Sequence, residues 1–153
     1  MTASDDSALI ALSLEYADAV RSLDADRWGA TWTDDARWVL GPDREVAGRD
    51  AIVELWRTAI SKYTTVVQRY QACTFDVDGD TATGRCTLVE LNVVADGSRK
   101  FLAGHYDDSY RRTPDGWRFT AGLGREMRRA VSFLGEDLDA LEESAVGYAG
   151  PVK

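Results

Sequence analysis

An aspartate between two predicted helices is the first residue in this chain whose setting suits acid–base chemistry. Asp24 ends an amphipathic run, and Trp28 and Trp32 follow closely. A carboxylate packed among aromatic rings loses the solvent that stabilises its charge, and such a group can take up and return protons. The same carboxylate could instead cap a helix or accept backbone N–H bonds between the two helices. Both interpretations stay open from the sequence.

The single histidine, His105, is a second candidate for acid–base chemistry. It lies in a strand-like run, 99–112, whose alternate residues face opposite sides of a sheet. Tyr106 and Asp108 belong to one set, whereas His105 and Asp107 belong to the other. His105 therefore points away from Tyr106 unless a strand bulge turns it. The scattered carboxylates, two cysteines and one histidine lack the spacing of metal ligands, so we predict no metal site.

Aromatic residues are the other feature that could shape a site. The tryptophans are expected mostly in the core, where they could also wall an apolar cavity for a ring-shaped ligand. Tyr16 could hydrogen-bond a substrate oxygen or pack as a plain core residue, and the same holds for Tyr106. The tryptophans are Trp28, Trp32, Trp38, Trp56 and Trp117.

The composition limits the classes of partner. A chain of 153 residues can form one domain with a sizeable core. Its formal net charge of −8 argues against nucleic acid, whose phosphates require clustered Lys and Arg. No apolar run approaches the roughly 20 residues that span a membrane, and the first residues do not resemble a signal peptide. We therefore expect a cytoplasmic protein with no nucleic-acid or membrane partner and with reduced cysteines.

Three helices are predicted before any long strand. The spacing of apolar residues predicts a helix over 4–23, capped by Ser4 or Ser7. A second helix is expected over about 27–33 with Asp26 as its cap, and Asp50 is expected to cap a third. The predicted inner face of the first helix comprises Leu9, Ile10, Leu12, Leu14, Tyr16, Ala17, Val20 and Leu23.

A short hairpin and a long meander make up the predicted sheet. Three Asp-Gly-type turns divide the second half of the chain into β-rich runs, which is typical of antiparallel strands. Helices followed by a meander predict an α+β fold with the helices on one face of a curved sheet. We expect one domain over 1–134 and an acidic tail or short helix over 135–153. The predicted strands are 36–40, 44–47, 65–77, 81–94, 99–112 and 117–130.

Two cysteines flank the first turn of the meander. If Gly79 and Asp80 form its loop, Cys73 and Cys86 lie directly opposite each other across the hairpin. We expect two packed thiols there. A disulfide would require that register and an oxidising setting.

Several short segments together resemble the SnoaL-like branch of the nuclear transport factor 2-like superfamily. The resemblance implies a cone-shaped domain, a cystatin-like α+β barrel with three N-terminal helices packed on a strongly curved, mainly antiparallel sheet. The branch includes polyketide cyclases, ketosteroid isomerases, dehydratases, a dehydrochlorinase, an epoxide hydrolase and non-catalytic binders, so it predicts the fold better than the reaction. The matching segments lie at 23–28, 32–36, 47–52, 77–82 and 110–118.

The resemblance also implies roles for individual residues. Dehydratase and dehydrochlorinase members pair an Asp at the end of the first helix with a His on the first meander strand; these positions fall on Asp24 and Gln68. Glutamine cannot carry a proton at neutral pH, so the Asp–His pair is broken here. Cyclase members place an acid on the third meander strand, which falls on Asp108 or, one residue away, on Asp107. Asp108 could instead be a solvated rim residue or part of an ion pair. The resemblance suggests that the face of Tyr106 and Asp108 lines the cavity.

The leading hypothesis is a cofactor-independent enzyme that moves protons next to the carbonyl of a hydrophobic cyclic substrate, by isomerisation, cyclisation or dehydration. Asp24 would be the general base and Asp108 a second acid–base group, with His105 as a further candidate. The alternatives are a non-catalytic hydrophobic-ligand-binding domain and an epoxide hydrolase. A homo-oligomer, dimer or trimer, is expected through the open sheet face. The predicted substrate-binding residues are Tyr16, Gln68, Tyr106, Trp28, Trp56 and Leu102.

Overall fold

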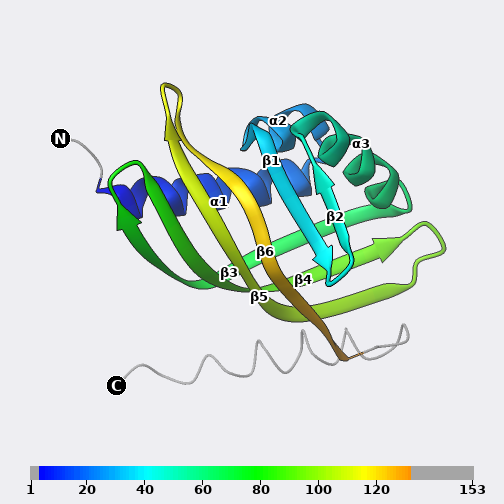
Figure 1. Ribbon diagram of the computed structural model, residues 1–153. Coiled ribbons are helices and arrows are strands. Elements are labelled where there is room, and N and C mark those ends of the chain that lie inside the picture. The colour runs from blue at the N-terminus through cyan, green and yellow to red at the C-terminus, as the bar shows by residue number, and fades with distance from the viewer. Residues whose placement is uncertain (1–3, 132–153) are drawn as a thin grey trace, which may run out of the picture.

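In the computed structural model, the described residues form three helices and a six-stranded sheet (Figure 1). The structure describes residues 4–131, with side chains described for 4–122, so the predicted tail over 135–153 lies outside the described residues. The predicted α+β class with helices packed on a curved sheet is confirmed. The elements are α1 (Asp5–Arg21), α2 (Ala25–Ala30), β1 (Trp32–Gly41), β2 (Arg44–Ala47), α3 (Arg49–Ile60), β3 (Tyr63–Asp78), β4 (Thr81–Val94), β5 (Arg99–Thr113) and β6 (Gly116–Val131).

The sheet is a meander closed by the first hairpin. Its strand order is β2-β1-β6-β5-β4-β3, and only the β1–β6 pair is parallel. The long, curved strands β3 to β6 wrap around α1, which packs against β3 and β6, while α2 and α3 lie together beside β1 (Figure 1). None of the helices in the described part of the chain is long and apolar enough to cross a bilayer.

The first helix is capped as expected but turns a different stripe inward. The Ser7 backbone N–H donates to Ser4 Oγ at 3.3 Å, which completes the first turn of α1. Ile10 and Leu14, predicted to face inward, are 44% and 55% exposed. A helix can bury only one continuous stripe against the sheet. The buried stripe consists of Leu9, Leu12, Ser13, Tyr16, Ala17, Ala19 and Val20.

The boundaries of the next two helices differ from the prediction. α2 begins earlier than expected, because Asp24 rather than Asp26 is its N-cap. Trp32 does not end this helix but begins β1, where backbone pairing with β6 fixes an extended conformation. At α3 the N-cap position is Gly48, which makes no side-chain cap bond. The predicted cap, Asp50, lies in the first helical turn instead.

Aromatic packing fills the core between the helices and the sheet. The rings of Trp28 and Trp56 are stacked, with centroids 4.7 Å apart and an interplanar angle of 14°. Tyr16 lies against Trp28, Trp32 and Phe119. Such ring pairs each contribute about 0.5–1.5 kcal/mol beyond their buried area. The expectation that the tryptophans are mainly core residues is confirmed, since four of the five are buried and Trp38 packs against the core.

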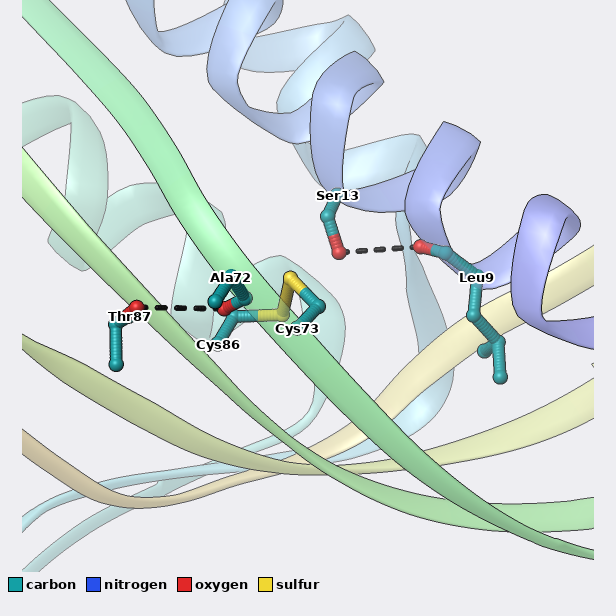
Figure 2. The surroundings of a disulfide bond; sticks show 6 residues. All are labelled: Leu9, Ser13, Ala72, Cys73, Cys86 and Thr87. Carbon is teal, nitrogen blue, oxygen red and sulfur yellow. Dashed lines mark hydrogen bonds between the residues drawn. A yellow bond between two sulfur atoms is a disulfide. The ribbon is translucent and has the colours of Figure 1, made fainter.

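A disulfide bond joins β3 and β4 (Figure 2). Cys73 and Cys86 are directly opposite each other, as the predicted turn requires. The expectation of two free thiols is wrong, because opposed cross-strand positions bring the sulfur atoms within bonding reach. Leu9 and Ser13 of α1 lie across from the disulfide in Figure 2, and the Ser13 hydroxyl donates to the Leu9 carbonyl at 3.1 Å.

Candidate active site

A cavity of about 250 Å³ lies where α1, α3 and β1 meet the inner face of β3, β4 and β5. Its walls are mainly apolar and aromatic, as binding sites for small organic molecules usually are. Four polar residues, Gln68, Glu90, Asn92 and Tyr106, interrupt the walls. The other lining residues are Tyr16, Val20, Trp38, Val39, Leu40, Trp56, Ala59, Ile60, Tyr63 and Val66.

The four polar residues form one hydrogen-bonded group. Gln68 Nε2 donates to Glu90 Oε2 at 2.7 Å and to the Tyr106 hydroxyl oxygen at 3.1 Å. Asn92 Nδ2 donates to Glu90 Oε1 at 2.7 Å. Each carboxylate oxygen of Glu90 is therefore held by a neutral amide, which fixes the orientation of the group. Among the described lining residues, Glu90 is the only one with a carboxylate.

Strand pairing explains why these residues meet. Gln68 of β3 lies directly opposite Glu90 of β4, so both side chains leave the same face of the sheet. Asn92 is two residues further along β4 and shares that face. Tyr106 lies on β5, the other neighbour of β4, directly opposite Cys86. Its hydroxyl oxygen accepts the second N–H of Gln68.

Two amide oxygens of this group have no hydrogen-bond partner among the described residues. Gln68 is 9% exposed and Asn92 is 3% exposed. A carboxylate only accepts hydrogen bonds, so Glu90 forces the nitrogen of each amide toward itself. In the described part of the chain, the remaining oxygens, Gln68 Oε1 and Asn92 Oδ1, meet no hydrogen-bond donor.

Comparison with known proteins identifies the family. The model of the SnoaL-like domain matches residues 1–121. The chain belongs to the SnoaL-like domain family. The resemblance seen in the sequence is thereby confirmed. No curated protein gives a significant match.

Solved structures share the fold of this SnoaL-like domain. A "putative aromatic ring hydroxylase" from Novosphingobium aromaticivorans is 25% identical, with a TM-score of 0.75 over 92% of this chain and 99% of that one. A "putative scytalone dehydratase" from the same organism is 16% identical, with a TM-score of 0.74 over 86% and 89% of the two chains. A hexachlorocyclohexane dehydrochlorinase from Novosphingobium barchaimii is 16% identical, with a TM-score of 0.68 over 86% and 95%. At such identities the last two show the fold alone.

Four of the predicted site residues come together in the cavity of the SnoaL-like domain. Tyr16, Trp56, Gln68 and Tyr106 all line it. Trp28 lies behind Trp56 and is completely buried. Leu102, also predicted, is directly opposite Glu90 in the β4–β5 register but is not among the described lining residues.

The predicted base, Asp24, has a structural task in this fold. Its Oδ1 accepts the backbone N–H of Arg27 at 3.0 Å and so caps α2. Asp24 is half-buried and does not belong to the described lining of the cavity. Of the two interpretations left open by the sequence, the helix cap is the one visible in the geometry. A catalytic role for Asp24 stays a prediction.

The predicted acid on β5, Asp108, lies on the same inner face as Tyr106. It is 4% exposed, so it is not a solvated rim residue. It lies opposite Gly84 and Gly122 on the two neighbouring strands, and it borders a groove beside Phe75 rather than the cavity. Its role in acid–base chemistry stays a prediction.

The two other acid–base candidates on β5, Asp107 and His105, lie on the outer face of the sheet. Asp107 forms a two-pronged ion pair with Arg85, at 2.6 and 2.7 Å. The Arg85 guanidinium lowers the pKa of the Asp107 carboxyl. His105 Nε2 is 3.5 Å from Asp107 Oδ2, and His105 is not part of the described cavity lining. The strand parity therefore predicted the direction of His105 correctly.

Sequence reasoning missed Glu90 and Asn92. On β4 the alternate set Val89, Leu91 and Val93 is the more apolar one, so it would be expected to face the core. The opposite is found: Asn92 is buried, whereas these three residues are partly exposed on the outer face.

Proposed function

We propose that this SnoaL-like domain is a cofactor-independent enzyme that transfers protons on a small, apolar, cyclic carbonyl compound. The reaction would be an isomerisation, a cyclisation or a dehydration. One observation carries the proposal: Glu90, a carboxylate oriented by two amides, lies in a cavity whose walls are mainly apolar and aromatic. The similarity in fold to structures described as a dehydratase and a dehydrochlorinase agrees with chemistry that begins by removing a proton.

Glu90 is the group that we assign to the proton transfer. Its carboxylate would remove a proton from the carbon next to the substrate carbonyl, leaving the electron pair in an enolate, and would return the proton elsewhere on the substrate. Tyr16 and Tyr106 line the same cavity, and their hydroxyl groups would donate to the developing oxyanion. A well-placed general base contributes on the order of 10²–10⁴ to the rate.

This assignment replaces Asp24 as the proposed base. The Asp24 carboxylate is engaged as a cap of α2, whereas Glu90 reaches the cavity directly. Asp108 is buried on the same sheet face, two residues from Tyr106, and we keep it as a proposed second acid–base group. His105 belongs to the outer face and is not part of the proposed mechanism.

The size of the cavity narrows the substrate class. Sites for drug-sized ligands usually measure about 300–1,000 Å³. A volume of about 250 Å³ is smaller than this range. The proposed substrate is therefore a molecule of one or two rings.

Proton exchange with solvent tests the proposal without knowledge of the full reaction. Small cyclic ketones would be incubated with the protein in D₂O, and loss of the proton next to the carbonyl would be followed by NMR. We expect Glu90→Gln to slow exchange by about 10²–10⁴. Glu54→Gln, on the exposed side of α3, is the matched control and should exchange at the wild-type rate. Equal rates for wild type and Glu90→Gln would refute the proposal.

A non-catalytic binding domain is the second candidate. It is favoured by the hydrogen bonds from Gln68 and Asn92 to Glu90, because such a group can serve structure alone. Tight binding of ring compounds without proton exchange would support this candidate. The epoxide hydrolase alternative needs an arginine beside the acids, and the described lining of the cavity includes none.

We also propose that the domain forms a homo-oligomer through the outer face of the sheet. The partly exposed residues Val89, Leu91 and Val93 make that face apolar along β4. Apolar sheet surfaces of this kind commonly mark protein–protein contacts. Size-exclusion chromatography with light scattering tests this: a monomer at micromolar concentration would contradict it.

A further inference from the structure

We propose that the ligand of the cavity carries a hydrogen-bond donor, a ring hydroxyl or ring amine, and presents it to Glu90. This inference rests on the proposed function in one respect only: it places the ligand in the same cavity. It concerns binding and does not require turnover. It also limits the predicted substrate-binding role of Gln68: a substrate carbonyl needs a hydrogen-bond donor, and both N–H groups of Gln68 are already used.

The amide hydrogens of Gln68 are fully used inside the polar group. A glutamine side chain has two N–H donors. One of them points to Glu90 Oε2 at 2.7 Å, and the other to the Tyr106 hydroxyl oxygen at 3.1 Å. Asn92 also directs an N–H to Glu90, at 2.7 Å. Gln68 therefore has no N–H left for a ligand, and one N–H of Asn92 is also directed to the carboxylate.

Once these hydrogen bonds are counted, Glu90, Gln68 and Asn92 have more acceptor positions left than donors. Each oxygen of Glu90 has accepted one amide N–H and retains capacity for another hydrogen bond. Gln68 Oε1 and Asn92 Oδ1 have no donor in the described part of the protein. These two oxygens are closed off from the cavity, so Glu90 is the acceptor that a donor on the ligand would reach. A hydrogen bond to a charged group contributes more than one to a neutral group, so a ligand that brings a donor to Glu90 is favoured. A ligand without an O–H or N–H group cannot make this bond.

The apolar and aromatic walls of the cavity indicate what kind of molecule carries this donor. Trp38, Trp56 and Tyr63 line the cavity together with aliphatic residues, which suits the flat faces of an unsaturated ring. The volume of about 250 Å³ admits one or two rings. The inferred ligand is therefore a small aromatic or unsaturated ring with at least one O–H or N–H group.

Four one-ring probes separate the possibilities: phenol, aniline, anisole and acetophenone. Their dissociation constants would be measured by NMR chemical-shift titration of the wild-type protein. We expect phenol or aniline to bind roughly tenfold or more tightly than anisole and acetophenone, because only the first two can donate to the carboxylate. The order of phenol and aniline then tells which donor the site prefers. Equal affinity for phenol and anisole would overturn the inference.

Substitution of the carboxylate provides the second arm of the test. In Glu90→Gln the preference for phenol over anisole should fall to within about twofold, while Glu54→Gln should keep it. An unchanged preference in Glu90→Gln would overturn the inference. If Glu90→Gln does not fold, the wild-type titration still decides: phenol must shift the side-chain amide resonances of Gln68 and Asn92 more than anisole does. If the wild-type protein prefers phenol to anisole but catalyses no proton exchange, the proposed enzyme is refuted and the ligand class is not.

Discussion

Replacing Asp24 by alanine should destabilise the domain by removing the cap of α2. The bond from the Arg27 N–H to Asp24 Oδ1 is 3.0 Å long and satisfies one of the first N–H groups of a helix of only six residues. Loss of such a cap costs about 1 kcal/mol, within a range of roughly 0.5–2. For a domain of this length, that corresponds to a fall of about 2–4 °C in Tm. Asparagine caps helices as well as aspartate does, so Asp24→Asn should keep most of the stability.

The assay is thermal and urea unfolding of three variants beside the wild type. Asp24→Ala should show the loss, and Asp24→Asn should stay close to wild type. The control is Asp43→Ala, at an exposed position in the β1–β2 turn, which should change stability by less than about 0.5 kcal/mol. If Asp24→Ala unfolds like the wild type, or if Asp24→Asn loses as much as Asp24→Ala, the capping account of Asp24 is refuted.

Three further predictions concern stability. Reducing the Cys73–Cys86 disulfide, which closes a loop of sequence separation 13, should lower the free energy of unfolding by about 2–3 kcal/mol, as measured in urea with and without reductant. Gly84→Ala should cost about 1–3 kcal/mol in the same assay, because an added Cβ would lie 2.5 Å from an aromatic carbon of the paired strand. The Arg111 guanidinium lowers the pKa of Asp35 to about 2, so Asp35→Asn should lose up to about 1 kcal/mol at neutral pH. That loss should fade as the pH falls from about 4 through 2, because the carboxylate then becomes protonated in the folded state as well; a loss that persists at low pH would contradict the ion-pair explanation.

The turns of the meander could be predicted because their chemistry is local. Gly79, Gly97 and Gly116 all adopt positive φ, at 59°, 83° and 101°. Such a conformation favours glycine whatever the rest of the fold does. These turns mark the ends of four long strands, and they also gave the correct pairing of the two cysteines. The fold class follows from this local information.

The pairing of Gln68 with the candidate acid could not be predicted, because it depends on a bulge in β3. Counting back from the first turn without interruption pairs Gln68 with Leu91. The register shifts between Tyr70 and Ala72, and this shift places Gln68 opposite Glu90 instead. It also reverses which residues of β3 face the core. A bulge depends on sheet curvature and packing, so it cannot be predicted from the sequence of these strands.

The role of Asp24 was ambiguous for a different reason. Asp24 and Asp26 both stand before a predicted helix, and either could have been its cap. Backbone geometry decides: Asp24 has an extended conformation, and its side chain reaches the N–H of Arg27. Asp26 is exposed and pairs with Arg57 of α3 at 2.7 Å. Neither arrangement can be told from residue types alone.

The most direct test of the central claim compares proton exchange in Glu90→Gln and Asp24→Asn, with the same cyclic ketone, in D₂O. Both substitutions replace one carboxylate by an amide of nearly the same shape, so they differ only in which acid is lost. We predict that Glu90→Gln loses about 10²–10⁴ in rate while Asp24→Asn exchanges like the wild type. A loss confined to Asp24→Asn would contradict the account and return the base to the end of α1.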